Sequence, residues 1–454
     1  MLTRFKVSGF KNLENVDISF GPFICVAGSN AVGKSNLFDA MMLLSFLAEH
    51  PFLKAFSKIR STVGNPDNNV KSSLSNSVIS GEKNLILEAN LLIPPTVVDD
   101  FGQVVHVPKQ FLSYRLELHY EPESESMKLP GGTLSLVDES IRPLKNEDLL
   151  PWQQSIVGKF LHGNYQKPFL SVNDRTAKAR NGKRGPNPSV PTEKTQRTVL
   201  SALASAELPA LLGVREELKS WRFIALEPSA MRSPDNIMET EFVNSVGAHI
   251  PATLYRLDKA NPDRQVYFEA RDIVSDLVDV QNLRVVDDSV RQTLELRATV
   301  GYSPELPARS LSDGTLRFLA LVAMEMMDEY CGLIAMEEPE NGIHPGKIPA
   351  LLNLLLDLST ERNDVLRQVV INTHSPYLVQ EIVHQDTGLL RAAYAFTRKN
   401  PDSTVTASTT FNPIRNPENP VESSDLHEDS AARSIPLNQL IDFLRNPAME
   451  TDDD

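Results

Sequence analysis

The chain has 454 residues, and its 45 Lys and Arg residues against 59 Asp and Glu residues give a formal net charge of −14. Its 41% hydrophobic and 23% charged residues are ordinary for a globular protein, which excludes a disordered or fibrous chain. Two cysteines exclude a disulfide framework or a cysteine-based zinc site, and the sequence shows neither a secretory signal nor an apolar run of ~18 residues, so we expect a cytoplasmic protein without a membrane span.

The first part of the chain combines short strands with one clear helix. Three segments are typical of strands: residues 5–10, 16–20 and 23–28. Residues 36–49 are predicted to form a helix, because Leu37, Met41, Leu44 and Leu47 recur at steps of three and four. A Ser- and Asn-rich loop is expected over residues 60–80, followed by a pair of strands at 85–93 and 111–120.

A basic segment lies in the middle of the chain. Residues 121–215 show weak periodicity, and within them residues 175–197 hold seven basic residues, one acidic residue, three prolines and two glycines. This composition predicts a mobile basic loop. The loop could be a solvated insertion, or it could contact nucleic acid or a partner.

The second half alternates strands with helices. Strands are expected at 220–226, 282–288, 293–300, 332–338, 368–375, 389–396 and 404–411. Helices are expected around 240–260, 265–280, 315–330 and 349–359. This alternation predicts an α/β fold around a largely parallel sheet.

The C-terminal tail is acidic. Residues 421–454 contain nine acidic and two basic residues, which is half of the net charge. Within it, residues 434–446 can form a short helix with Ser434 as N-cap and Pro436 in the first turn. One face of this helix would hold Ile435, Leu437, Leu440, Ile441 and Leu444. An isolated helix of this length is marginal in water, so it should dock either on its own domain or on a neighbouring subunit or partner.

A glycine-rich loop carries the strongest motif. Gly28 to Ser35 (GSNAVGKS) fits G-x-x-x-x-G-K-[ST] between a buried strand and a helix. The glycines let backbone N–H groups surround a phosphate, Lys34 can reach the outer phosphates, and the Ser35 hydroxyl can bind Mg²⁺. The start of the helix also favours an anion.

Two carboxylates, a capped helix and a histidine form the remaining candidate site. Glu337 and Glu338 close an apolar strand, where they are costly unless a cation or donor is present. We expect Glu337 to hold the Mg²⁺ shell through water and Glu338 to act as general base. Ser312 and Gly314 begin a helix, where they could bind an anion or simply cap it. His374 follows a buried strand and is expected to contact the γ-phosphate, although a purely structural histidine is the alternative.

The order of these motifs resembles ABC-type ATPases. GSNAVGKS, LSDGT (311–315), LIAMEEPENGIHP (333–345) and NTHSP (372–376) are similar to the Walker A, signature, Walker B with D-loop, and switch-histidine motifs. Within that class the chain is similar to the RecF, SMC and OLD clade, and the resemblance covers residues 1–60 and 215–400.

This resemblance implies an ABC-type ATPase head with a largely parallel central sheet, an antiparallel β subdomain and a mid-chain insertion. ATP and Mg²⁺ would bind between two heads of a homo-oligomer. The expected nucleotide-binding residues are Gly28, Asn30, Gly33, Lys34, Ser35 and Asn36, with Ser312 and Gly314 acting on ATP held by another subunit. The resemblance assigns Mg²⁺ to Ser35 and Glu337 and catalysis to Glu338 and His374. The expected divisions are 1–120, 121–215, 216–420 and 421–454.

Two departures from the family pattern stand out. Walker B usually has Asp where this chain has Glu337, and no Q-loop glutamine is found after the first helix. Only 80 residues follow His374, too few for the TOPRIM nuclease of OLD proteins, and no SMC-like coiled arm is present. We therefore expect a stand-alone ATPase.

Three functions are compatible with these features. The first is an ATP-dependent sensor or scaffold that controls a separate effector, such as a nuclease or toxin, as in stand-alone phage-defence ATPases of the AriA type. The second is a RecF-like repair ATPase whose basic segment touches the DNA backbone. The third is a nucleotide-bound oligomer with negligible turnover.

Overall fold

The computed structural model describes residues 1–59, 69–122, 132–149, 165–182, 188–260, 263, 265–275, 277–327, 332–359, 361–362, 365–385, 390–399, 405–415 and 435–445. The chain forms two compact units. The first comprises residues 1–21, 28–221 and 391–454, and the second comprises residues 22–27 and 222–390.

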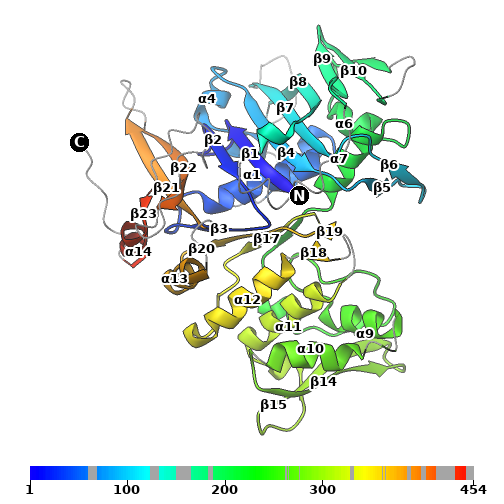
Figure 1. Ribbon diagram of the computed structural model, residues 1–454, viewed down its shortest axis with the longest axis vertical. Coiled ribbons are helices and arrows are strands. Elements are labelled where there is room, and N and C mark those ends of the chain that lie inside the picture. The colour runs from blue at the N-terminus through cyan, green and yellow to red at the C-terminus, as the bar shows by residue number, and fades with distance from the viewer. Residues whose placement is uncertain are drawn as a thin grey trace. The chain divides into compact units, whose positions relative to one another are not determined.

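The first unit is built on an eight-stranded antiparallel sheet with the order β11-β10-β9-β8-β7-β4-β1-β2 (Figure 1). Its strands are β1 (Leu2–Ser8), β2 (Val16–Ser19), β4 (Leu85–Leu92), β7 (Phe111–Glu121), β8 (Thr133–Pro143), β9 (Leu170–Asn173), β10 (Thr176–Ala179) and β11 (Ser189–Pro191). The expected pairing of residues 85–93 with 111–120 is confirmed, because β4 pairs with β7. A separate hairpin joins β5 (Thr96–Val98) to β6 (Val104–His106).

This sheet is amphipathic. In β1, Phe5 and Val7 are buried, whereas Lys6 points to the other face. There Lys6 lies opposite Asp17 and beside Glu88, with 3.7 Å between Nζ and Oε1 of Glu88. One face therefore packs into the core while the other carries ion pairs, as expected for an antiparallel sheet that is solvated on one side.

Two loop predictions are wrong in part. Within the basic segment, β10 and β11 form the edge of the sheet, and residues 183–187 lie outside the described residues. Ala177 and Ala179 are buried while Lys178 is exposed, so buried and exposed residues alternate as in a strand. The glycines and prolines nearby make this strand pattern hard to recognise in the sequence. Residues 60–80 contain α3 (Asn69–Ser72) and α4 (Asn76–Ile79), whereas residues 60–68 are outside the described part.

Besides α3, α4 and a helix in the C-terminal tail, the described part of the first unit contains the helices α1 (Lys34–Leu47), α2 (Phe52–Ser57), α6 (Val199–Leu203) and α7 (Pro209–Lys219). Helix α1 packs against α2 and α7. Leu37, Met41, Leu44 and Leu47 are all fully buried, which confirms the apolar face expected from their spacing. The helix begins at Lys34, so the glycine loop leads directly into its first turn.

A C-terminal hairpin completes the first unit. Strand β21 (Leu390–Lys399) pairs antiparallel with β22 (Val405–Arg415), which confirms the two late strands. The tail helix α14 spans only Leu437–Arg445, because Ile435–Pro436 forms strand β23 parallel to β22. The residue before a proline favours extended backbone, which explains why the helix does not start earlier. The expected N-cap, Ser434, is outside the described residues.

The second unit contains a parallel sheet formed by β12 (Arg222–Ile224), β17 (Ile334–Glu337), β20 (Val369–Thr373) and β3 (Phe23–Ala27), in that order. Strands β3 and β20 are buried at every position. Such continuous apolar runs are typical of parallel strands covered on both faces. The α/β fold with a parallel sheet and an antiparallel β subdomain is therefore confirmed.

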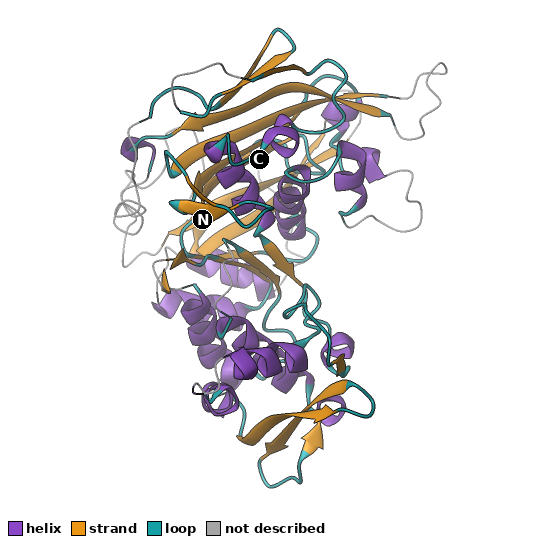
Figure 2. Ribbon diagram, turned by 90° about the vertical axis from the view of Figure 1, so that its right-hand side faces the viewer, coloured by secondary structure: helices purple, strands orange, loops and turns teal. Residues whose placement is uncertain are grey.

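Helices and a small antiparallel sheet complete the second unit (Figure 2). The helices are α8 (Pro228–Met231), α9 (Ile250–Ala260), α10 (Val266–Ser275), α11 (Asp313–Glu325), α12 (Ile348–Leu358) and α13 (Pro376–Gln385). The small sheet holds β13 (Asp235–Asn236), β14 (Val280–Asp288), β15 (Thr293–Val300) and β16 (Leu306–Pro307). Helix α10 packs on β14, and α11 packs against α10 and α12. In the described part of the chain, no helix is both long and apolar enough to cross a membrane.

Candidate functional site

The glycine loop follows β3 and has a backbone that suits glycine. Ala31 and Gly33 have positive φ angles of 66° and 105°. A Cβ atom at Gly33 would lie 2.5 Å from Thr409 Oγ1, and one at Gly28 would lie 2.6 Å from the Ala393 carbonyl oxygen. Both positions therefore have no room for a side chain, and the loop keeps its backbone accessible between them.

Lys34 is folded over this loop. Its side chain is buried, and Nζ donates hydrogen bonds to the carbonyl oxygens of Gly28 and Ser29, both at 2.7 Å. Asn30 and Ser35 are exposed. The first turn of α1 holds no acidic residue. One loop thus combines an ammonium group, a hydroxyl group and a helix N-terminus. The ammonium group and the helix N-terminus suit a phosphate chain, and the hydroxyl oxygen suits the cation bound to it.

Asn36 has a partner of its own. Its Nδ2 donates to Asn12 Oδ1 at 2.7 Å, in the turn between β1 and β2. The side-chain amide therefore braces the first turn of α1 against that turn. Direct contact of Asn36 with a nucleotide stays a prediction.

Glu338 and His374 lie together in the second unit. Strand β17 ends at Glu337, and the next residue, Glu338, has a φ of 45°, which is rare for a residue with a side chain. Its N–H donates to the carbonyl oxygen of Asn372 at 3.1 Å and to Asn372 Oδ1 at 3.2 Å. Its carboxylate Oε1 lies 2.7 Å from His374 Nδ1, and Oε2 accepts from Asn341 Nδ2 at 2.8 Å. The strained backbone thus places the carboxylate against the histidine.

Glu337 is the last residue of β17 and lies opposite Asn372 in the parallel register with β20. It is partly exposed, unlike the apolar residues before it in the strand. Its expected role in holding Mg²⁺ stays a prediction.

Glu340 is a buried carboxylate that sequence reasoning missed. One oxygen, Oε1, accepts from the Thr373 hydroxyl, while Oε2 is buried with no hydrogen-bond partner among the described residues. Burial raises the pKa of Glu340 above its usual value. Arg317 Nε on α11 is also buried without such a partner, and its charge interacts with that of Glu340. In the sequence, Glu340 is marked only as a third acidic residue two positions after Glu338, within a polar segment (PENGIHP) that gives no sign of burial.

Ser312 is the N-cap of α11. Its Oγ accepts from the Thr315 N–H at 3.2 Å and lies 2.8 Å from Thr315 Oγ1. A Cβ atom on Gly314 would lie 3.2 Å from the carbonyl oxygen of Gly342, so this helix start packs against the segment that follows Glu338. The capping role is observed, whereas contact with ATP of another subunit stays a prediction.

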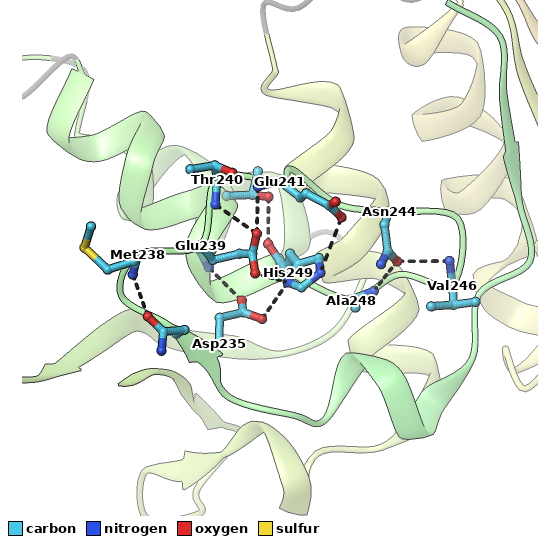
Figure 3. A network of polar contacts seen from close by, with 12 residues as sticks. Asp235, Met238, Glu239, Thr240, Glu241, Asn244, Val246, Ala248 and His249 are labelled. Carbon is cyan, nitrogen blue, oxygen red and sulfur yellow. Dashed lines mark hydrogen bonds and ion pairs between the residues drawn. The ribbon is translucent and has the colours of Figure 1, made fainter. Parts of the chain in front are cut away.

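A second polar cluster surrounds His249 before α9 (Figure 3). His249 Nδ1 lies 2.9 Å from Asp235 Oδ1 and 3.8 Å from Glu239 Oε2, and Nε2 lies 3.9 Å from Glu241 Oε2. Asp235 Oδ2 accepts from the Ala252 N–H in the first turn of α9. These contacts fix the loop before α9, which explains why that helix begins at residue 250 rather than 240.

Within the described ranges, no group of three or more His, Cys, Asp or Glu residues is arranged to hold a metal ion.

Part of this chain matches a family model. Residues 178–380 match the family described as "AAA domain, putative AbiEii toxin, Type IV TA system". The match covers less than half of the chain and includes Ser312, Glu338 and His374, but not the glycine loop. Residues 178–380 thus carry the sequence pattern of an AAA domain.

Three solved structures of SMC heads are similar to this chain at low scores. An SMC head bound to the C-winged helix domain of ScpA has 12% identity and a TM-score of 0.44, with coverage of 90% of this chain and 97% of that chain. The SMC head with an extended coiled coil bound to the C-terminal domain of ScpA, from Pyrococcus furiosus, has 10% identity and a TM-score of 0.43, with coverage of 90% and 96%. The SMC head domain from Thermotoga maritima has 12% identity and a TM-score of 0.38, with coverage of 91% and 99%. Comparison with curated proteins gives no match.

Proposed function

We propose that this chain is an ABC-type ATPase head that binds and hydrolyses ATP. The observation that carries this proposal is the glycine loop, in which Lys34 Nζ lies 2.7 Å from two loop carbonyls and Gly28 and Gly33 leave no room for side chains. The AAA-domain match over residues 178–380 supports the same class.

The residues have distinct parts in this proposal. The loop from Gly28 to Gly33, the Lys34 ammonium group and the start of α1 would bind the phosphates, while Ser35 and Glu337 would hold Mg²⁺. Bound Mg²⁺ would neutralise charge on the phosphates. Glu338 would accept a proton from the attacking water as general base. His374 would hold the Glu338 carboxylate in place through the 2.7 Å contact between Nδ1 and Oε1.

We also propose that ATP joins two copies of the chain. The exposed Ser312 and the partly exposed Gly314 begin α11, where a phosphate of ATP held by another subunit could meet the helix N-terminus. We further propose a role in bacterial defence, as a sensor or scaffold that controls a separate effector such as a nuclease or toxin. Its support is the general one that the matching family is described with the words "putative AbiEii toxin, Type IV TA system", which name a toxin–antitoxin system.

A second candidate is a RecF-like DNA-binding ATPase. The observation in its favour is the basic edge of the eight-stranded sheet, where Arg175, Lys178 and Lys194 are exposed. Arg175 is paired with Glu193 at 2.6 Å, so part of this charge is already neutralised. We therefore place this candidate second.

The experiment that tests the proposal is ATP binding and phosphate release by the purified chain. We expect ATP to bind in the presence of Mg²⁺ and to be turned over slowly. We expect Lys34→Ala to lose binding while staying folded, with a lower thermal stability because its two hydrogen bonds to the loop are lost. A parent protein that binds no ATP at millimolar concentration would contradict the proposal. Binding without measurable turnover would favour a structural nucleotide-bound oligomer.

A further inference from the structure

The C-terminal hairpin approaches the glycine loop at two points within the first unit. A Cβ atom on Gly28 would lie 2.6 Å from the Ala393 carbonyl oxygen on β21, and a Cβ atom on Gly33 would lie 2.5 Å from Thr409 Oγ1 on β22. Both hairpin strands therefore pass close to the backbone of the loop, although they lie more than 360 residues further along the chain.

Thr409 makes specific hydrogen bonds at this contact. Its side chain is almost fully buried, and Oγ1 donates to the Val32 carbonyl oxygen at 2.5 Å. The same oxygen accepts from Asn12 Nδ2 at 2.8 Å, and the Thr409 N–H donates to the Asn12 carbonyl oxygen at 3.0 Å. Because Asn12 Oδ1 in turn accepts from Asn36 Nδ2, one uninterrupted chain of hydrogen bonds runs from α1 to the loop.

The orientation of the loop follows from this chain of contacts. The Val32 carbonyl belongs to the same planar peptide as the Gly33 N–H, so fixing the carbonyl also fixes the direction of that N–H. The Asn36 side chain fixes the first turn of α1 at the other end. The N–H groups between these two points are those that a phosphate-binding loop offers to its ligand.

We propose that Thr409 is a positioning residue that holds the glycine loop ready for the triphosphate of a nucleotide. This inference rests on the proposed ATP-binding function and deepens it. Thr409 does not touch the ligand. It stabilises the loop conformation through the Val32 carbonyl and Asn12, so the C-terminal hairpin belongs to the nucleotide site although no sequence motif marks it.

The test uses the full-length chain with Thr409→Val, which keeps the side-chain shape but removes the hydroxyl. A lost neutral hydrogen bond corresponds to about a three- to tenfold change in an equilibrium constant, so we expect the Kd for ATP to rise by about that factor. The kcat at saturating ATP should change by less than about twofold, because Thr409 does not act on the reacting atoms. Thr409→Ser should restore the parent's Kd.

Thr410→Val is the matched control. Thr410 is the next residue of β22, and its Oγ1 accepts from Asn412 Nδ2 at 3.2 Å, outside the chain of contacts to the loop. We expect this variant to keep the parent's Kd. Asn12→Ala, in a partly exposed turn, breaks the same chain and should raise the Kd even if Thr409→Val fails to fold.

A second readout does not depend on ATP. In nucleotide-free protein, Thr409→Val should speed hydrogen–deuterium exchange of the amides from residue 32 to 37 and leave the parallel strands β17 and β20 unchanged. If the parent binds no ATP, the proposed function fails, but faster exchange in this segment still supports the positioning role. Unchanged exchange together with an unchanged Kd would overturn the inference, and so would an equal effect of Thr410→Val.

Discussion

His374 Nδ1 lies 2.7 Å from Glu338 Oε1, and this contact joins the ends of two neighbouring parallel strands. The other oxygen of Glu338 accepts from Asn341 Nδ2 at 2.8 Å. The carboxylate is thus held at both oxygens on a backbone with positive φ. A carboxylate fixed in this way has one orientation to offer to a water molecule, which is what a general base requires.

Glu338→Gln is expected to keep ATP binding and to slow hydrolysis by about 10²–10⁴, the usual range for a lost general base. The amide can still contact His374 and Asn341 but cannot take up the proton. Binding titration and phosphate release measure the two effects separately. Glu241→Gln, an exposed glutamate in the same unit, is the control and should hydrolyse ATP like the parent. Parental turnover by Glu338→Gln would show that another group is the base.

Mixing Ser312→Arg protein with Lys34→Ala protein is expected to restore part of the hydrolysis that each variant lacks alone. In a mixed dimer, one composite site would combine an intact glycine loop with an intact Ser312. Because Ser312 caps α11, its replacement also costs about 1 kcal/mol of stability, so thermal denaturation must confirm that the variant is folded. Ser312→Asn retains a side chain that can cap the helix, so it serves as the variant in which the serine is changed but the cap is preserved. No recovery in demonstrated mixed dimers would argue against sites shared between subunits.

The parallel strands β3, β17 and β20 could be predicted from the sequence because each lies in a mainly apolar run. Glu338 and His374 follow two such runs, and parallel strands bring their carboxyl ends to one edge, so this contact could be foreseen. Sequence periodicity also located α1, because Leu37, Met41, Leu44 and Leu47 recur at helical spacing, although most of the other residues of this helix are buried as well.

Other parts of the site depend on contacts that local patterns do not encode. Thr409 lies 397 residues from Asn12 and sits in an unremarkable strand, so only the folded chain brings the two together. Glu340 was missed because its role depends on burial beside Thr373 rather than on spacing. The sequence predicts a loop where the edge strand β10 forms, because three prolines and two glycines lie within residues 175–197.

Glu139 is expected to make stability depend on pH. It is fully buried, it accepts from the N–H groups of Val199 at 2.6 Å and Leu200 at 2.8 Å, and burial raises its pKa from 4.5 to about 7. Between pH 4.5 and about pH 7, Glu139 in the folded chain holds a proton that the same residue in the unfolded chain has released. The contribution of Glu139 to the free energy of unfolding therefore falls as the pH rises from about 4.5 to 7, by about 3 kcal/mol in total.

Urea unfolding at several pH values measures this effect as the difference between the parent and Glu139→Gln. Other groups titrate in both proteins, so only the difference reports on Glu139. We expect the parent to lose stability relative to Glu139→Gln as the pH rises from 5 to 7. Glu207→Gln, an exposed glutamate of the same unit, should leave the slope unchanged. Parallel pH curves for the parent and Glu139→Gln would contradict the raised pKa.

The basic edge of the eight-stranded sheet decides between the two candidate functions. Lys178 is exposed on β10 and Lys194 is exposed after β11, whereas Arg180 donates to the Pro168 carbonyl oxygen and is partly buried. Changing Lys178 and Lys194 to Ala should therefore remove charge without loosening the sheet. If these residues contact DNA phosphates, the slope of log affinity against log salt should become shallower by about 2. Lys54→Ala with Lys71→Ala removes two exposed charges elsewhere in the same unit and is the control. DNA affinity and salt slope equal to those of the parent would reject this edge as a DNA-binding surface and leave the effector-controlling ATPase as the better account.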